Sequence, residues 1–465
     1  MATALQGFGL LATYSAMVFL VAWAFARGEQ TKESFLVANR NVGEWRAAFS
    51  IASAWIWAPA LFVSAQKAYE NGWVGLFWFL VPNALCLVIF SYFAKLMREK
   101  APNGFTLSEY MLTRYSKRVH NAYLFQQIGL LACCLAVQLL AGGKIVATIT
   151  GIPFFWVTVI LAAIAVSYSI LFGLRASVVT DFFKMLFIFV IGATLIPWAL
   201  KMSGGLEVLK AGLYGKTGTF TSLFSGDGAA LFWSFGLSTT IGLIAGPFGD
   251  QAFWQRGFAV RKEKVAGAFI KGALIFSLVP LMMSALGFIA AGANLEVKDP
   301  SIVNVEAILH LLPAWAVIPF ILMIISGLVS ALDSHLTAIS SIGGHDLSKR
   351  AGKEGRSLSF ARTSMIFLMV AAIWIANIPG IQVLYLFMLY GTLRSSTLLP
   401  TVMTLLSDRL TEKGIFWGIV SSIAIGLPIF AYGNYHQITP MIVSGSLITL
   451  FTSGAVAWLM RRKAV

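Results

Sequence analysis

Two carboxylates interrupt otherwise apolar segments of this 465-residue sequence, where an isolated charge is costly to bury. A buried carboxylate binds a cation, carries a proton or pairs with a basic side chain. We expect Asp181 to bind a cation or a proton, with an ion pair to Lys184 or Arg175 as the alternative. Asp333 is expected to act in ion coupling or in ligand binding.

Hydroxyl side chains recur through the segment that carries Asp333. They are spaced so that a helix would place them on one face: Ser326, Ser330, Ser334, Thr337 and Ser341. Sodium prefers a cage of oxygen ligands, so this face is a candidate sodium site. Small hydroxyl residues also let helices approach closely, which explains most of the stripe equally well. His335, alone on its face, is expected to be a hydrogen-bonded structural group.

Two segments combine proline, small and aromatic residues in a way that is typical of interrupted helices. The first is Ser53-Ala-Trp-Ile-Trp-Ala-Pro59 and the second is Gly246-Pro-Phe-Gly-Asp250. Backbone groups freed at such interruptions bind ligands, although a proline can also simply kink a packed helix. Core packing is likewise the alternative role for the tryptophans. We predict a ligand site between the segments, formed by Trp55, Trp57, Gly246, Phe248, Gly249 and Asp333.

These residues belong to a chain that is too apolar for a water-soluble protein. Of its residues 58% are hydrophobic and 11% are charged, whereas a soluble domain carries roughly 25% charged residues. Apolar runs long enough to cross a bilayer recur about thirteen times along the chain. The sequence therefore predicts an all-α, multi-pass protein of the cell membrane, with the lipid bilayer as its solvent.

Other classes of protein fit the sequence poorly. The net charge of +15 does not indicate nucleic-acid binding, because the basic residues sit at helix ends rather than in one stripe. The stretch 212–217 resembles a phosphate loop but has its glycines too close together, so we expect no ATP-driven pump. The cysteines show no disulfide or metal-ligand spacing. No nucleophile–base pair is evident, so an enzyme is not expected.

The distribution of Lys and Arg orients the predicted helices. Thirteen spans put the two termini on opposite sides and divide the loops into two sets. One set holds nearly all the basic loop residues, and the other holds only Lys201, Lys210, Lys216 and Lys298. Because cytoplasmic loops are enriched in Lys and Arg, we expect the C-terminus inside the cell and the N-terminus outside.

Four motifs give the chain a resemblance to the sodium:solute symporter family. They are Ser34-Phe-Leu-Val-Ala-Asn-Arg40, Gly173-Leu-Arg-Ala-Ser-Val-Val-Thr-Asp181, Asp250-Gln251 with Gln255-Arg256, and Ser330-Ala-Leu-Asp-Ser-His335 running on to Asp346. The resemblance covers most of the chain. Within the family, Trp55-Ile-Trp-Ala-Pro-Ala-Leu61 and the following Ala68-Tyr69 are similar to the urea active transporters.

The resemblance implies a LeuT-type fold, in which five helices are followed by five more in inverted orientation. On this chain it implies a single transporter domain, 1–465, with repeats 45–200 and 229–405, an extra N-terminal helix 8–26 and two extra C-terminal helices in 414–459.

The resemblance also implies a sodium site. Its ligands would be the carbonyls of Ser53, Ile56 and Gly327 and the hydroxyl of Ser330. Ala331 stands where the family has a second hydroxyl, and Asp181 would compensate for it.

The resulting prediction is sodium-coupled symport of a small polar organic solute into the cell, with urea or a similar amide as the first candidate. Proton-coupled symport of the same class and sodium symport of an amino acid such as proline are the alternatives. A passive solute channel is the alternative from another class. The sequence makes no prediction of the oligomeric state.

Overall fold

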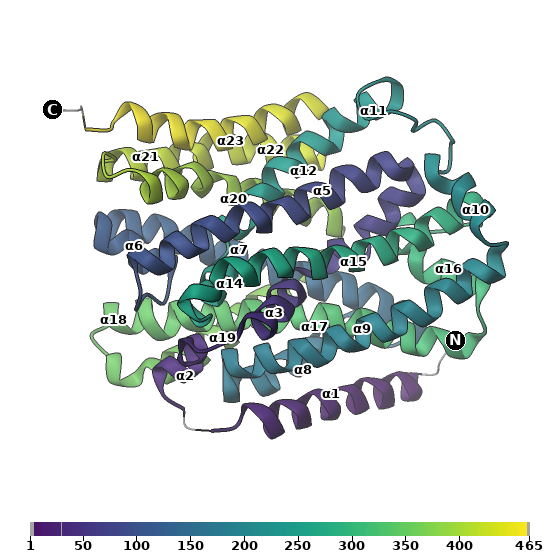
Figure 1. Ribbon diagram of the computed structural model, residues 1–465, viewed down its shortest axis with the longest axis horizontal. Helices are drawn as coiled ribbons and strands as arrows, with labels where there is room; N and C mark the ends of the chain where they lie inside the picture. Colours follow the sequence, from purple (N-terminus) through teal and green to yellow (C-terminus); the bar gives the residue numbers. More distant parts are fainter. Residues whose placement is uncertain (1–3, 29, 463–465) are drawn as a thin grey trace.

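The computed structural model describes residues 4–28 and 30–462 and consists of helices joined by loops (Figure 1). The described residues contain no β-strand, only an isolated bridge between Val42 and Val260. Most of the long helices run along one common direction and end at the two opposite ends of the bundle (Figure 1). The all-helical class predicted from the sequence is confirmed.

Within the described residues, 10 helices are long and apolar enough to cross a membrane. They are formed by α1 (Ala4–Ala26), α5 (Val63–Lys100), α7 (Lys117–Thr150), α8 (Phe154–Phe172), α9 (Leu174–Ser203), α15 (Val265–Gly292), α17 (Val317–Ser341), α19 (Ser357–Ala376), α21 (Glu412–Ser421) with α22 (Leu427–Tyr435), and α23 (Thr439–Leu459). In Figure 1, α1 and the α21–α23 group flank the bundle on opposite edges. This set of apolar helices makes the chain a multi-pass membrane protein.

Three further apolar runs predicted from the sequence do not form such helices, and two of them are divided. The run that begins at Trp45 becomes α3 (Glu44–Trp55) and α4 (Ala58–Leu61). The run that begins at Ala229 becomes α11 (Gly226–Leu231), α12 (Leu237–Ile244), α13 (Gly246–Gly249) and α14 (Gln251–Ala259). The third run forms α20 (Val383–Leu406), which is continuous but carries the polar stretch Thr392–Thr397.

The divided helices confirm both predicted interruptions. Helix α3 ends at Trp55, and α4 follows the extended residue Trp57 with Pro59 in its first turn. Helix α13 likewise has Pro247 in its first turn, and the extended backbone of Asp250 separates it from α14. A proline at the start of a helix removes an N–H that would have no intrahelical partner anyway. Pro59 therefore begins a new segment after an extended residue, whereas Pro247 follows the helical residue Ala245 and the extended break of the second run lies at Asp250.

Packing around the interruptions sets where functional side chains can meet. Helix α3 packs against α9, α15 and α17, and α4 contacts α7 and α20. Helices α12 and α13 pack against α20, and α14 packs against α17. The first interruption thus lies between α7, α9, α17 and α20, and the second lies beside α17 and α20.

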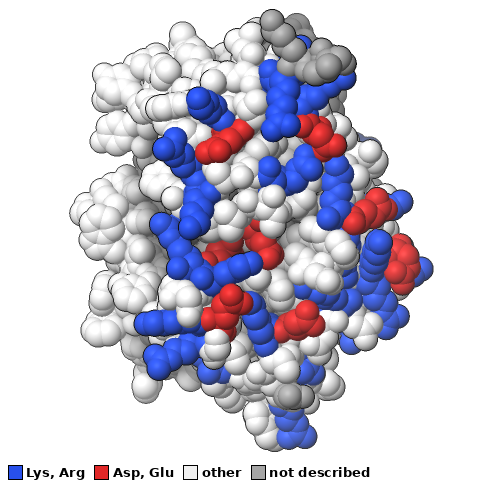
Figure 2. Space-filling model, turned by 90° about the vertical axis from the view of Figure 1, so that its left-hand side faces the viewer, with Lys and Arg blue, Asp and Glu red and all other residues white. Residues whose placement is uncertain are grey.

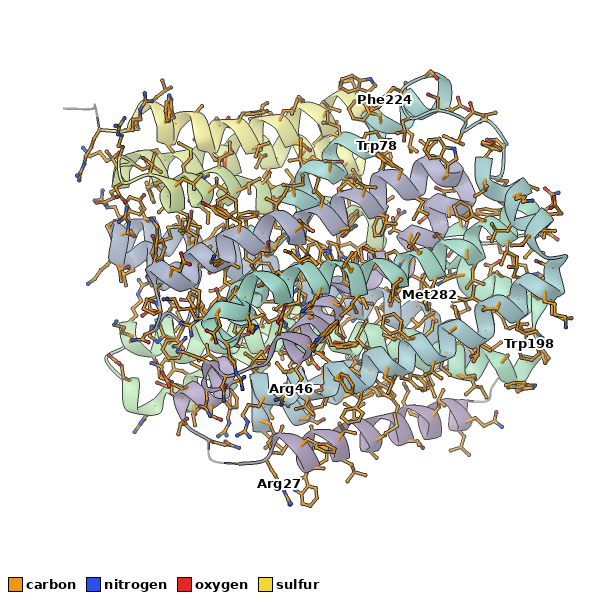
Figure 3. The ribbon with its side chains drawn as sticks, viewed as in Figure 1. Arg27, Arg46, Trp78, Trp198, Phe224 and Met282 are labelled. Atoms are coloured by element: carbon orange, nitrogen blue, oxygen red, sulfur yellow. The ribbon has the colours of Figure 1, made fainter. Side chains whose placement is uncertain are left out.

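The two ends of the bundle differ in charge. One end carries the short helices α2 (Lys32–Val37), α6 (Leu107–Arg114) and α18 (Ser348–Arg350), and the other carries α10 (Leu206–Ala211) and α16 (Val303–Leu311). Figure 2 looks onto the first end, and Lys and Arg side chains cover much of it. Lys and Arg side chains therefore gather at this end of the bundle, which is on the left in Figure 3.

Close packing of α15 on α5 gives a test of the fold. A Cβ on Gly287 would overlap the carbonyl oxygen of Ala65 and lie 2.9 Å from the Cβ of Ala68. Because this backbone cannot move aside, we expect Gly287→Ala to lower the free energy of unfolding by about 1–3 kcal/mol. The purified variant should melt at a lower temperature. Gly9→Ala on α1, with no neighbour within 4 Å, is the matched control; equal melting of the two variants would contradict this packing.

Candidate functional site

The residues predicted to hold a cation meet where α3, α9 and α17 pack together. Ser53 Oγ lies 2.5 Å from Ser330 Oγ, and the Ser330 hydroxyl donates to Asp181. Gly327 adjoins them, since a Cβ there would lie 3.1 Å from Ile56 Cγ2. All five residues are buried. We call Ser53, Ile56, Asp181, Gly327 and Ser330 the cation group.

Asp181 has a basic partner that the sequence analysis missed. Arg256 on α14 is buried, and its Nη2 lies 3.4 Å from Asp181 Oδ2. The guanidinium also donates to Ser50 Oγ over 3.1 Å, and the Ser50 hydroxyl donates to Asp181 over 2.6 Å. Lys184, one of the two partners expected for Asp181, pairs with Asp333 instead. The Gln-Arg motif of the family resemblance was the one sequence signal for Arg256.

Asp333 lies in the same polar network rather than beside the tryptophans. Lys184 Nζ lies 2.5 Å from Asp333 Oδ2, and the Tyr168 hydroxyl donates to the same oxygen over 2.5 Å. The Ser177 hydroxyl donates to Asp333 Oδ1 over 2.9 Å and accepts from Arg256 Nη2 over 3.3 Å. We call Asp181, Asp333, Lys184 and Arg256 the charge network, because Ser177 joins the two ion pairs. Its two carboxylates and two cations balance.

The two interruptions meet at a pair of stacked tryptophans. The rings of Trp55 and Trp57 have centroids 5.2 Å apart and planes 23° apart. The Trp55 ring packs on the backbone of Gly246, where a Cβ would overlap the ring. Gly249 also lies close to α20, because a Cβ there would lie 3.1 Å from Arg394 Cα. The structure therefore brings together Trp55, Trp57, Gly246 and Gly249 from the predicted ligand site.

Phe248, also predicted for the ligand site, packs in another direction. Its ring lies 5.1 Å from Phe90 and 5.2 Å from Phe93 of α5, centroid to centroid. Its carbonyl oxygen accepts from the indole N–H of Trp254 over 2.8 Å. Phe248 thus anchors the second interruption to α5, and the structure does not bring it to Trp55 and Trp57.

Arg394 of α20 occupies the place beside the tryptophans. Its guanidinium carbon lies 5.4 Å from the ring centroid of Trp55, 5.1 Å from that of Trp57 and 4.7 Å from that of Tyr390. The side chain is 1% exposed, and its Nη2 donates to Asp250 Oδ2 over 3.1 Å. Arg394 is therefore paired inside the protein rather than extended toward a membrane surface.

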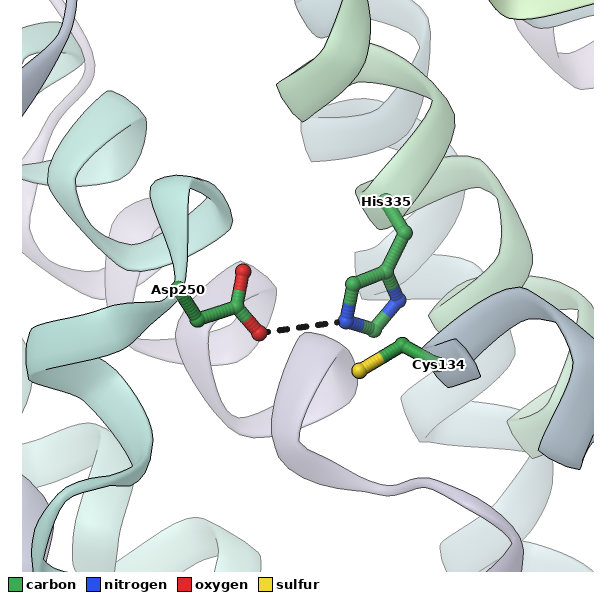
Figure 4. A group of neighbouring side chains, drawn as sticks. All are labelled: Cys134, Asp250 and His335. Carbon is green, nitrogen blue, oxygen red and sulfur yellow. Dashed lines mark hydrogen bonds and ion pairs between the residues drawn. The ribbon is translucent and has the colours of Figure 1, made fainter. Parts of the chain in front are cut away.

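Cys134, Asp250 and His335 form a neighbouring cluster (Figure 4), with their ligand atoms within 4.8 Å of one another. His335 Nε2 lies 3.2 Å from Asp250 Oδ2, while Asp250 Oδ1 caps α14 by accepting from the Ala252 N–H over 2.9 Å. Arg394 Nη2 reaches the same Oδ2 and lies 3.6 Å from Cys134 Sγ. A divalent cation in this cluster would face that guanidinium, so we assign no metal to it.

A cavity of about 450 Å³ opens at the end of the bundle that carries α16. Its lining includes Phe62, Gln66, Glu70, Lys144, Asp299 and Val383. Lys144 Nζ lies 2.5 Å from Asp299 Oδ2 and links α7 to the loop before α16. Partial burial favours the protonated acid, but hydrogen bonds from Lys144 and Ser301 hold the pKa of Asp299 below its ordinary value. The cavity therefore has a charged rim.

These features define a class of protein. Two interrupted helices meet inside a multi-pass bundle, beside buried and balanced charges, as in membrane transporters. The sequence model of the sodium:solute symporter family matches residues 35–421, and the chain belongs to this family. The resemblance found in the motifs is confirmed.

Known relatives and structures agree with this assignment. The chain is 25% identical to the probable urea active transporter 1 of Schizosaccharomyces pombe, over 96% of this chain and 71% of that protein. It is 23% identical to the urea-proton symporter DUR3 of Oryza sativa subsp. japonica, over 97% and 69% of the two chains. Its fold matches a Na⁺-coupled sialic acid symporter in a substrate-bound outward-open state, with a TM-score of 0.76, 16% identity and 99% coverage of both chains. All three are transporters, not enzymes.

Variants of the buried ion pair between Asp333 and Lys184 should change the stability of the protein. Removing one partner leaves an uncompensated buried charge, so Asp333→Asn or Lys184→Met should each cost about 3–5 kcal/mol. The double variant should recover much of this loss, and melting of the purified proteins measures it. Glu207→Gln, in the exposed pair with Lys210 on α10, should change little. Additive losses in the double variant would show that the pair is not coupled.

Proposed function

We propose that the protein is a secondary active symporter that takes a small polar organic solute into the cell together with sodium. One observation carries the proposal: the cation group and the tryptophan pair share the interruption between α3 and α4. Ser53 belongs to the first, and Trp55, two residues later, belongs to the second. An ion and a solute bound there would act on the same short backbone segment, and such shared dependence is what couples two ligands.

Sodium is the proposed coupling ion. The cation group offers oxygen atoms from three helices: the carbonyls of Ser53, Ile56 and Gly327, the Ser330 hydroxyl and the Asp181 carboxylate. The hydrogen bonds that link Ser53, Ser330 and Asp181 support this set of ligands. They bring into contact three residues that are far apart in the sequence. Asp181 would supply the negative charge and the oxygen that Ala331 lacks.

A proton is the second candidate, and Arg256 is the observation that favours it. The guanidinium already balances Asp181, as Lys184 balances Asp333. A further monovalent cation would add positive charge to a neutral network, whereas a proton could be relayed by its carboxylates. The naming of the rice relative as a urea-proton symporter supports this candidate as well.

Urea or a related amide is the proposed solute. The names of the two urea-transporting relatives support it. The stacked rings of Trp55 and Trp57 fit a flat solute of this kind. The proposed site lies beside these rings, where the segment that carries Gly246 and Gly249 meets them. A passive channel would bind the same solute, but it could not concentrate it.

We further propose thirteen membrane spans, ten of them forming two inverted repeats. The repeats would be 45–200 and 229–405, with 8–26 before them and two helices in 414–459 after them. The α3–α4 span and the α11–α14 span would each open one repeat. The basic end of the bundle would then face the cytoplasm, with the C-terminus inside and the N-terminus outside.

Serine variants on α17 test the coupling ion. Labelled urea uptake is measured in proteoliposomes with a sodium gradient, a proton gradient or neither, at fixed membrane potential. Loss of one oxygen ligand worth about 1.4 kcal/mol should raise the half-maximal sodium concentration of Ser330→Ala about tenfold. Ser326→Ala is the matched control, because that hydroxyl donates within its own helix to the Leu322 carbonyl.

Wild-type uptake separates the candidates. Uptake that depends on the proton gradient and not on sodium would show that the proton is the coupling ion. Equilibration without accumulation under any gradient would identify a channel and overturn symport.

Cysteine labelling tests the orientation. Thr217 and Lys353 lie in loops at opposite ends of the predicted topology. In intact cells, an impermeant thiol reagent should modify Thr217→Cys and leave Lys353→Cys unmodified until the membrane is opened. The unmodified chain gives the background, since Cys86 and Cys134 are buried and Cys133 is half-buried. The reverse labelling pattern would invert the topology.

A further inference from the structure

Buried hydrogen-bond donors without acceptors gather beside the tryptophan pair. Among the described residues, no partner is found for Arg394 Nε and Nη1, Trp57 Nε1 or the Tyr390 hydroxyl. These side chains are at most 2% exposed. Buried polar groups are nearly always hydrogen-bonded, and an unpaired charged donor is the most costly kind. Their concentration in one place points to a ligand that brings acceptors.

The cavity at the α16 end lies at the start of α20, the helix that carries Tyr390 and Arg394. Val383 lines the cavity, and Phe387, Tyr390 and Arg394 follow it at helical spacing. At the rise of an α-helix, Arg394 lies about 16 Å deeper than Val383. The rings of Phe387 and Trp57 meet edge to face with centroids 5.3 Å apart. This aromatic contact joins the residue one turn beyond Val383 to the tryptophan pair.

His335 and Arg394 share one partner, because both lie against Asp250 Oδ2. His335 Nδ1 lies 2.6 Å from the carbonyl oxygen of Ala331, which only accepts, so Nδ1 carries a hydrogen. His335 Nε2 faces Asp250 Oδ2 at 3.2 Å, so that contact needs a second hydrogen, on the ring or on the carboxyl. With it, Asp250 and His335 together are neutral. Cys134 Sγ, 3.6 Å from Arg394, is only a weak acceptor.

We propose that Arg394 determines solute specificity. It receives a carbonyl or carboxylate oxygen of a small flat solute that stacks on Trp57, and its positive charge rejects solutes that offer only cationic donors. This inference rests on the proposed function, because it assumes that the tryptophan pair marks the solute site. Urea and small monocarboxylates share the required acceptor oxygen, and guanidinium has the planar shape of urea without any acceptor.

Thermal stabilisation of the purified full-length protein tests the inference. Urea, acetate and guanidinium are compared at millimolar concentrations, well below those that denature proteins. Urea or acetate should raise the melting temperature of the wild type, and guanidinium should not. Arg394→Gln should weaken binding of the solute that stabilises the wild type at least tenfold. Arg394→Lys should lose part of the affinity for that solute, because an ammonium lacks the planar fork of a guanidinium. Ser395→Ala is the control on α20, since its buried hydroxyl donates to the Thr392 carbonyl of the same helix.

Each outcome decides the inference. Stabilisation by urea supports a carbonyl at Arg394, and stabilisation by acetate alone supports a carboxylate while excluding urea as the solute. Guanidinium acting as well as urea, or neither acceptor acting, overturns the inference, as does unchanged affinity in Arg394→Gln. Should that variant not fold, the wild-type comparison of urea with guanidinium decides alone. Gradient-driven uptake is scored separately, so loss of coupling and loss of acceptor recognition remain distinguishable.

Discussion

Backbone groups that leave a helix inside a hydrocarbon layer must find partners within the protein, because no water is there to hydrogen-bond them. Both interruptions meet this constraint with side chains from elsewhere. Gln138 of α7 accepts from the Ala58 N–H over 2.7 Å at the start of α4, and Asn304 of α16 donates to the Leu61 carbonyl over 3.0 Å at its end. At the second interruption, Gln126 of α7 donates to the Gly249 carbonyl over 3.4 Å, while Asp250 caps α14 from within the interruption. The polar residues of the surrounding helices are therefore needed to hold the interrupted backbone even without a ligand.

The same requirement ties the two functional groups together. Helix α14 begins at Asp250 and carries Arg256 less than two turns later, so one short segment reaches both Arg394 and Asp181. Helix α17 does the same, with Ser330 in the cation group and His335 against Asp250. A shift of either segment would change the surroundings of the proposed ion site and the proposed solute site at once. Coupling of this kind needs no separate relay between the sites.

Charge is distributed unevenly between these groups. The charge network is neutral without any added ion, because each carboxylate lies against its own basic side chain. The cluster around Arg394 contains buried donors without a partner. Burying unpaired donors costs free energy. Ionisable residues at membrane depth usually serve a function such as ligand binding. The proposed ion site and the proposed solute site thus differ in their surroundings as well as in position.

Several particular residues show how far sequence reasoning reached. Pro59, Pro247 and the flanking small residues predicted both interruptions, because proline and glycine act on their own backbone. The family motifs brought Ser53, Asp181 and Ser330 into one expected site, and these three do meet. Asp333 and Phe248 were also assigned to the solute, but they pack against Lys184 and α5.

The sequence by itself determined the membrane class, the family and the places where two helices break, because hydropathy, motifs and proline act locally along the chain. Which charges pair was decided only by the tertiary structure. Arg256 and Arg394 are ordinary basic residues in the sequence, and nothing local selects Asp181 or Asp250 as their partners. Helices distant in sequence become neighbours on packing, and burial in a medium of low dielectric constant then makes each pairing obligatory.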